Sequence, residues 1–189
     1  MARWKPHAPE RLATAALELF EERGYDSTTV NEITDRAGLT KSSFFRHFTD
    51  KREVLFDSRA LSDALLDGIA GAPPEAAAID AVARGFGCAG DAVFTPERRE
   101  FLARRAAVIS RTPELREREA LKEIGLVDAM IGALQERGVP HLTARVVAVL
   151  GALAFTIAYE RWLDPAATDT FPEILQVALR DVRAVNLPG

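Results

Sequence analysis

Cysteine and histidine are scarce in this 189-residue sequence. It has a single cysteine, Cys88, and three histidines that lie far apart along the chain. One thiol excludes an internal disulfide framework and any zinc or iron–sulfur site built from several cysteines. The dispersed histidines do not form a pattern typical of a metal cluster. We therefore expect no metal site and no cofactor, and we interpret Cys88 as a small buried side chain, with an oxidant sensor as the alternative.

Long apolar segments are also lacking. The longest nearly unbroken apolar run, Val146–Tyr159, has 14 residues, whereas a membrane-spanning helix needs roughly 20. The run therefore predicts a buried helix of a soluble protein. The first seven residues contain no apolar stretch that would act as a secretory signal. We expect a cytoplasmic protein with no membrane partner.

The sequence also lacks an excess of positive charge. The net charge is −4, although residues 1–60 carry 10 Lys and Arg against 10 Asp and Glu. The whole deficit therefore comes from residues 61–189, which carry 14 cations and 18 anions. The N-terminal third is relatively more basic without being a basic tail. If it binds nucleic acid, it must do so with a few well-placed cations rather than by bulk attraction.

Helical periodicity, by contrast, runs along almost the whole sequence, and no segment alternates in the manner of a strand. The fold class is therefore predicted to be all-α. Gly71-Ala72-Pro73-Pro74 is the clearest break in the chain. Prolines, glycines and N-cap residues delimit the predicted helices, which span about residues 9–23, 29–37, 41–48, 50–69, 75–93, 97–111, 114–137, 143–163 and 171–186.

The first three predicted helices match a helix-turn-helix, because the last two are joined by only Gly38-Leu39-Thr40. Gly38 permits a tight turn with a positive φ, Leu39 fills the core beneath the turn, and Thr40 caps the next helix. That helix would project its polar side chains into a DNA major groove, which is wide enough to admit one α-helix. Its aromatic residues are interpreted as anchors: Phe44, Phe45 and Phe48.

The turn belongs to a longer motif, Thr28-Thr29-Val30-x-x-Ile33-x-x-x-Ala37-Gly38-Leu39-Thr40-Lys41-Ser42-Ser43-Phe44-Phe45-Arg46-His47-Phe48-x-x-Lys51-x-x-Val54-Leu55. With its flanks, over about residues 9–58, this motif resembles the DNA-binding domain of the tetracycline-repressor (TetR) family. The resemblance implies an all-α homodimer that binds palindromic operators and releases them when a small molecule enters the C-terminal domain. Residues 1–58 would form the helix-turn-helix domain, with a linking helix to about residue 69, and residues 70–189 the helical regulatory, ligand-binding and dimerisation domain.

The resemblance also implies which residues contact DNA. Thr28 or Thr29 would cap the second helix and take a phosphate, although Thr29 alternatively acts only as a cap. Lys41 begins the recognition helix and would donate to a guanine edge or to a phosphate. Lys51 would meet a phosphate, and its alternative is a solvated side chain. The full predicted set is Thr28, Thr29, Thr40, Lys41, Ser42, Ser43, Arg46, His47 and Lys51.

Position 45 departs from the family pattern, in which a tyrosine hydroxyl often donates to a phosphate. Phe45 has no hydroxyl. Either this contact is absent here or His47 supplies it, since Arg46 and His47 would face the DNA backbone.

A glycine-rich run in the C-terminal part, Gly85-Phe86-Gly87-Cys88-Ala89-Gly90, satisfies the G-x-G-x-x-G dinucleotide fingerprint. That fingerprint requires a preceding strand, whereas residues 75–83 are predicted to be helical, so we reject nucleotide binding through it. Each glycine in a helix interior costs roughly 1 kcal/mol relative to alanine. Three so close together predict a kink, or a close approach of a helix or a ligand.

The last two predicted helices have more apolar surface than one side can bury, which favours a subunit interface over a monomeric core. The resemblance implies that they pair into a four-helix bundle in a homodimer. Residues of the larger domain are predicted to line a ligand pocket, with ordinary core, or a solvated face for the arginine, as the alternative. They are Phe86, Phe101, Arg104, Ile109, Met130, Phe155, Tyr159 and Trp162.

These features together predict a ligand-responsive transcription regulator, a repressor that binds double-stranded DNA as a homodimer and is released by a small molecule. The predicted helix from Asp50 to Ile69 would act as the lever between the domains. The alternative is a helical small-molecule-binding protein or an enzyme without operator binding. No nucleophile–base pair or carboxylate constellation in the sequence favours an enzyme.

Overall fold

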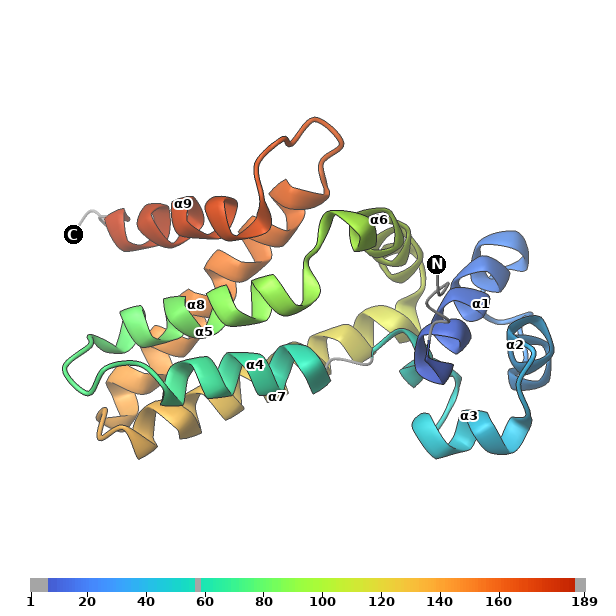
Figure 1. The fold of residues 1–189 in the computed structure, drawn as a ribbon, viewed down its shortest axis with the longest axis horizontal. Coiled ribbons are helices and arrows are strands. Elements are labelled where there is room, and N and C mark those ends of the chain that lie inside the picture. The colour runs from blue at the N-terminus through green and yellow to red at the C-terminus, as the bar shows by residue number, and fades with distance from the viewer. Residues whose placement is uncertain (1–6, 57–58, 186–189) are drawn as a thin grey trace, which may run out of the picture. The chain divides into compact units, whose positions relative to one another are not determined.

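The structure, a computed structural model, describes residues 7–56 and 59–185, and every regular element in these ranges is helical. The all-α prediction is therefore confirmed. In chain order (Figure 1) the helices are α1 (Ala8–Arg23), α2 (Val30–Ala37), α3 (Lys41–His47), the 3-10 helix η1 (Lys51–Leu55), α4 (Arg59–Ala70), α5 (Ala78–Val93), α6 (Pro96–Arg111), α7 (Pro113–Glu136), α8 (His141–Leu163) and α9 (Phe171–Ala184).

The chain divides into two compact units. The N-terminal unit consists of the described part of Met1–Asp57 together with Phe101–Ala120, and the second unit consists of the described part of the remaining chain. Residues 101–120, which were predicted to belong to the regulatory domain, are therefore grouped with the helix-turn-helix. As a result, α6 and α7 each contribute residues to both units.

One apolar core holds the N-terminal unit together. Phe44 and Phe48, which flank the exposed part of the third helix, are 0 % and 5 % exposed, so their predicted role as anchors is confirmed. The same prediction is wrong for Phe45, which is 50 % exposed and lies outside this core. Val108, Ile109 and Leu115 from α6 and α7 belong to the same buried cluster. Burial of these side chains explains why residues 101–120 join this unit, because apolar burial is the main favourable term in folding.

The predicted continuous helix from Asp50 to Ile69 is wrong in its first part. The Asp50 side chain caps a five-residue 3-10 helix by accepting from the Arg52 N–H at 2.7 Å, and the backbone leaves helical geometry at Phe56. Val54, Leu55 and Phe56 are all buried. This turn places three consecutive apolar side chains in the N-terminal core, which a longer amphipathic helix would not do.

In the second unit, α4 and α5 run side by side and are packed at a crossing of two glycines. A Cβ on Gly85 would lie 2.5 Å from the Leu65 carbonyl oxygen, and one on Gly68 would lie 2.6 Å from the Gly85 Cα. A Cβ on Gly151 of α8 would likewise lie 2.5 Å from the Val82 side chain of α5. The G-x-G-x-x-G run therefore lies within a continuous helix, and the predicted close approach of a helix is confirmed.

A cluster of aromatic rings joins α5, α8 and α9. Phe94 stacks on Phe171 with ring centroids 4.2 Å apart and lies 5.7 Å edge-on to Trp162. Phe86 stacks on Phe155 at 4.9 Å, and Phe155 is parallel to Tyr159 at 6.3 Å. Arg99 of α6 lies over the Trp162 ring.

Helix α8 has two different faces. Its buried residues are mostly small and include Ala144, Ala148, Gly151, Ala154 and Ala158. Leu142, Val146, Val149 and Leu153 lie on the opposite side and are 49–74 % exposed. The predicted buried helix is therefore buried on one face only in the single chain. By length and composition alone α8 would also suffice to cross a membrane, and 28 % of its apolar window is buried.

Candidate nucleic-acid interface

The turn between α2 and α3 is built as the sequence predicts. Gly38 has φ +62°, in the left-handed region, and its N–H donates to the carbonyls at the end of α2. The Leu39 N–H donates to the Thr34 carbonyl at 2.9 Å, and the Thr40 hydroxyl oxygen accepts from the Ser43 N–H at 3.1 Å. A glycine conformation and a side-chain cap thus fix the direction in which α3 leaves the turn.

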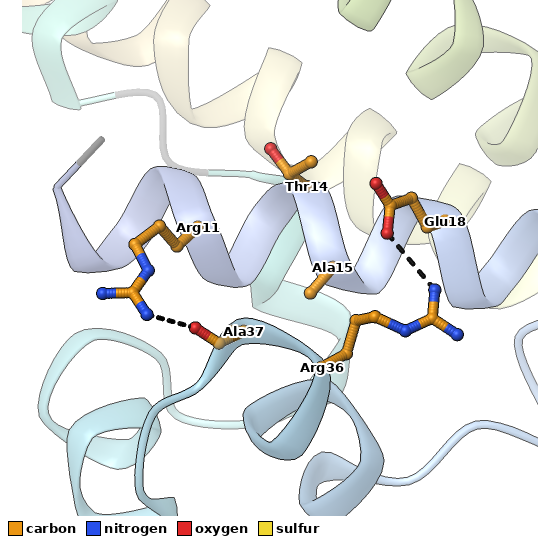
Figure 2. A pocket seen from close by; sticks show the side chains of 6 residues that line it. All are labelled: Arg11, Thr14, Ala15, Glu18, Arg36 and Ala37. Atoms are coloured by element: carbon orange, nitrogen blue, oxygen red, sulfur yellow. Dashed lines mark hydrogen bonds and ion pairs between the residues drawn. The ribbon is translucent and has the colours of Figure 1, made fainter. Parts of the chain in front are cut away.

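Arg11 of α1 adds a support to this turn that sequence reasoning missed. Its guanidinium donates to the Ala37 carbonyl (Figure 2). It also donates to the Gly38 carbonyl at 3.3 Å. These oxygens end α2 and have no partner inside that helix. In the sequence, the feature that could have indicated this support is the position of Arg11, directly before Leu12, which is the first residue of the buried stripe of α1. The group lies beside a shallow pocket of about 220 Å³ whose lining comprises Arg11, Thr14, Ala15, Glu18, Arg36 and Ala37.

Helix α3 is divided into a buried and an exposed side. Lys41, Ser42, Phe45 and Arg46 are exposed, and His47 is half-buried. Ser43, predicted to contact DNA, is instead 5 % exposed, and its hydroxyl oxygen accepts from Arg46 Nη2 at 3.4 Å. This hydroxyl therefore faces the protein rather than solvent.

The two threonines before α2 have different roles. Thr28 is 1 % exposed, and its hydroxyl donates to the Gly24 carbonyl at 2.9 Å, so it is not accessible to a phosphate. Thr29 is exposed and forms a complete capping box with Glu32, whose N–H lies 3.3 Å from the Thr29 hydroxyl oxygen. Hydrogen bonds from Thr29 lower the pKa of the Glu32 carboxyl below its ordinary value. The predicted cap at Thr29 is confirmed.

Several cations of this unit are already paired with acids. Arg36 lies 3.2 Å from Glu18 and 2.8 Å from Glu22, and the hydrogen bond to Glu22 raises the pKa of the guanidinium. Arg23 pairs with Glu32 at 2.6 Å. Among the described residues, Lys41 and Arg46 of α3 form no such ion pair. The positive charge available on α3 is therefore carried by these two side chains.

Lys51 is turned toward the protein. Its ammonium donates to the Tyr25 carbonyl at 2.7 Å and to the Thr28 carbonyl at 2.9 Å, and it lies 4.0 Å from the Tyr25 ring centroid. Burial lowers the pKa of this lysine and raises that of Tyr25 to about 12. The Lys51 side chain is therefore not solvated, and its ammonium does not point outward to meet a phosphate. It instead ties η1 to the loop before α2.

Residues 101–120 are fastened to the rest of the N-terminal unit by arginines. Arg104 Nε lies 3.1 Å from Glu21 on α1, and its hydrogen bonds lower the pKa of the Glu21 carboxyl. Arg105 Nε donates to the Leu55 carbonyl at 2.7 Å. Arg118 Nη2 donates to Glu53 at 2.9 Å. Hydrogen bonds and ion pairs from the end of α6 and the start of α7 therefore link this segment to both α1 and η1.

The eight predicted ligand-binding residues are divided between the two units. Phe101, Arg104 and Ile109 belong to the N-terminal unit, where Ile109 is 1 % exposed and part of the core. Phe86, Phe155, Tyr159 and Trp162 belong to the aromatic cluster of the second unit. Met130 of α7 is also in that unit and is fully buried.

Residues 12–57 match the family model of bacterial regulatory proteins of the tetR family. The transcriptional regulator TcmR of Streptomyces glaucescens is 41 % identical over 58 residues, which cover 30 % of this chain and 26 % of that protein. The transcriptional activator FasR of Mycolicibacterium smegmatis is 43 % identical over 44 residues, or 23 % and 20 % of the two chains. The matched segment thus spans about a quarter of the length of these regulators.

The fold as a whole also has a solved counterpart. Thermus thermophilus FadR, a TetR-family transcriptional repressor in complex with lauroyl-CoA, has a TM-score of 0.54 and 24 % sequence identity. The alignment covers 96 % of this chain and 99 % of the other. The predicted arrangement of an N-terminal helix-turn-helix domain followed by a helical domain is therefore confirmed.

Proposed function

Since residues 12–57 place this chain in the tetR family of bacterial regulatory proteins, we propose that it is a transcriptional repressor that binds a palindromic operator as a homodimer and is released by a small molecule. One observation carries the proposal. The exposed side of α3 presents Lys41, Ser42 and Arg46, while the Gly38 turn and the Thr40 cap hold the helix in place.

The roles of these side chains follow from their chemistry. Lys41 and Ser42 lie in the first turn of α3, the part that reaches base edges in helix-turn-helix docking. Arg46 donates to phosphates or to a guanine, because its guanidinium presents a planar fork of donors. Thr29 and Thr40 are exposed and His47 is half-buried, and these three residues are proposed to contact the DNA backbone. Lys51 acts indirectly, by fixing the loop before α2.

Dimer formation is proposed to cover the apolar stripe of α8, defined by Leu142, Val146, Val149 and Leu153. These residues follow a spacing of four, three and four along one side of the helix. Val177 of α9, which is 39 % exposed, adds to the same class of exposed apolar side chains. A symmetric pair would present α3 twice, as a palindromic operator requires.

The effector is proposed to bind in the second unit, at the aromatic cluster. Phe155 and Tyr159 are only half-buried there. A ligand with an apolar body would cover the exposed part of these two rings. Helices α6 and α7 contribute to both units and are the proposed route of coupling. A ligand changes operator affinity only by its preference for one conformation over the other.

Selection of binding sites from random double-stranded DNA with the full chain tests the proposal. The selected site should bind with a dissociation constant that rises steeply with salt, because cations displace counterions from phosphates. Lys41→Ala or Arg46→Ala should weaken binding and reduce the salt slope by about 1 for each phosphate that is no longer neutralised. Arg98→Ala, an exposed cation in the second unit, is the matched control and should leave both unchanged.

Failure to select any site would contradict the proposal. It is the result expected of a helical small-molecule-binding protein or an enzyme. A thermal-shift screen of apolar and acidic metabolites addresses the effector separately, because stabilisation by a ligand does not depend on DNA.

A further inference from the structure

Phe45 is an apolar residue on the otherwise polar exposed side of α3. Half of its surface (50 %) is exposed, whereas Phe44 and Phe48 are almost completely buried. Its exposed neighbours on the helix are polar: Lys41, Ser42 and Arg46. The N-terminal core is closed without the Phe45 ring, so core packing does not account for an aromatic residue at this position.

The position of Phe45 on the helix puts it near the centre of the exposed side. At 3.6 residues per turn, Ser42 lies opposite the buried side formed by Ser43, Phe44 and Phe48. Phe45 is three residues after Ser42, and Arg46 is four residues after it, so these two side chains flank Ser42. The hydroxymethyl group of Ser42 is small, which lets the helix come close to a groove at its centre.

The ring of Phe45 has a fixed support. It lies edge-on to Phe44, with ring centroids 5.3 Å apart and an interplanar angle of 77°. Phe44 is fully buried and also lies 5.5 Å from the Phe48 ring. Edge-to-face aromatic pairs are favourable, so the ring is held in place before any DNA is bound.

A phosphate offers nothing to such a ring, because phenylalanine has no donor. In the major groove the apolar group that distinguishes one base from another is the C5-methyl of thymine, and phenylalanine is among the side chains that contact it. We infer that Phe45 is a specificity-determining residue that contacts the C5-methyl group of a thymine in each operator half-site. The inference rests on the proposed function and adds a residue that the predicted DNA-contact set omits.

Removing single methyl groups from the DNA tests this inference. Each thymine of the selected site is replaced in turn by deoxyuridine, which differs from it only by the C5-methyl. Loss of the contacted methyl should weaken binding by the full chain about fourfold per half-site, the equivalent of one buried methylene. Methyl groups elsewhere in the site should matter little.

The Phe45→Ala variant then completes a double-mutant cycle with the same DNA. At the sensitive position, its affinities for the thymine and deoxyuridine sites should be equal. Phe45→Tyr keeps the ring and should retain the preference for thymine. Because Phe45 is exposed, the variants should melt within a few degrees of the unaltered chain, which distinguishes weaker DNA recognition from a failure to fold.

Each outcome bears on a different claim. If no thymine methyl contributes to binding, or if Phe45→Ala leaves the methyl effect unchanged, Phe45 does not read a methyl group and the inference is overturned. If Phe45→Ala instead abolishes association with another protein while DNA affinity is unchanged, the exposed ring is a protein-docking residue and the inference is likewise wrong. If the unaltered chain selects no DNA site, the proposed function itself fails.

Discussion

Arg118 of α7 and Glu53 of η1 form an ion pair in which Nη2 lies 2.9 Å from Oε2. Both side chains are mostly buried, with 26 % and 18 % of their surfaces exposed. The hydrogen bond to Glu53 raises the pKa of the Arg118 guanidinium. This pair joins the first part of α7 to η1, the element that directly follows α3. In the proposed mechanism it is one of the contacts through which a change in α7 reaches the DNA-binding helices.

Breaking this pair should cost stability in a way that only the pair explains. Arg118→Ala and Glu53→Gln should each lower the free energy of unfolding, and the double variant should lose less than the two together. The coupling free energy should be about 1 kcal/mol, as for partly exposed ion pairs. Chemical denaturation measures it. Arg116→Ala, an exposed arginine on the same helix, is the control and should have almost no effect.

Alanine should have opposite effects on stability at Gly38, which lies in a left-handed turn, and at Gly132, which lies within helix α7. Gly38→Ala should destabilise the chain by about 1–2 kcal/mol, because a side chain at positive φ is strained. Its Cβ would also lie 3.2 Å from Arg11 Nη2, which supports the same turn. Gly132→Ala is the comparison, since nothing lies within 4 Å of its added Cβ. In a helix interior that change should stabilise by about 0.5–1 kcal/mol; equal effects at both positions would argue against the turn.

Alanine substitutions in α5 should distinguish a glycine that packs against α4 from one that meets no neighbouring atom. Gly85→Ala forces a Cβ to within 2.5 Å of the Leu65 carbonyl oxygen, so α4 and α5 must move apart. A loss of about 3 kcal/mol is expected from such overpacking. Gly87→Ala on the same helix meets no atom within 4 Å and should raise stability by about 1 kcal/mol. Thermal melting of the two variants makes the comparison, and a Gly85→Ala chain as stable as the unaltered one would remove this account of the motif.

The apolar stripe of α8 should set the oligomeric state. Val149→Glu places a charge where the proposed dimer buries apolar surface, so the variant should be monomeric by light scattering at concentrations at which the unaltered chain is dimeric. Leu121→Glu alters another exposed apolar residue, 53 % exposed on α7, and should leave the dimer intact. Dimers of Val149→Glu would place the interface elsewhere.

Local chemistry explains what the sequence predicted correctly. The positive φ of Gly38, the Thr29 capping box and the Thr40 cap all depend on residues within a few positions of each other, so they can be identified without a structure. The burial of Phe44 and Phe48 follows from helical periodicity in the same way.

Long-range packing explains the rest. The predicted helix from Asp50 to Ile69 is interrupted because Val54, Leu55 and Phe56 fill the N-terminal core, a demand that periodicity does not show. Ile109 satisfies an apolar pattern equally well in either unit, and only the fold assigns it to the core around α1. For Ser43 and Lys51, the sequence identifies a polar group but not its direction, and both point toward the protein.

The most direct test of the central claim is hydroxyl-radical footprinting of the full chain on a site selected from random DNA. Two copies of the exposed side of α3, presented by a symmetric dimer, predict two protected segments on one side of the duplex. Their centres should lie about 10 base pairs, or a multiple of one helical turn, apart. Protection by the Phe45→Ala variant should follow the same spacing at higher protein concentration. A single protected segment, or protection that is unchanged by Lys41→Ala and Arg46→Ala, would contradict the account.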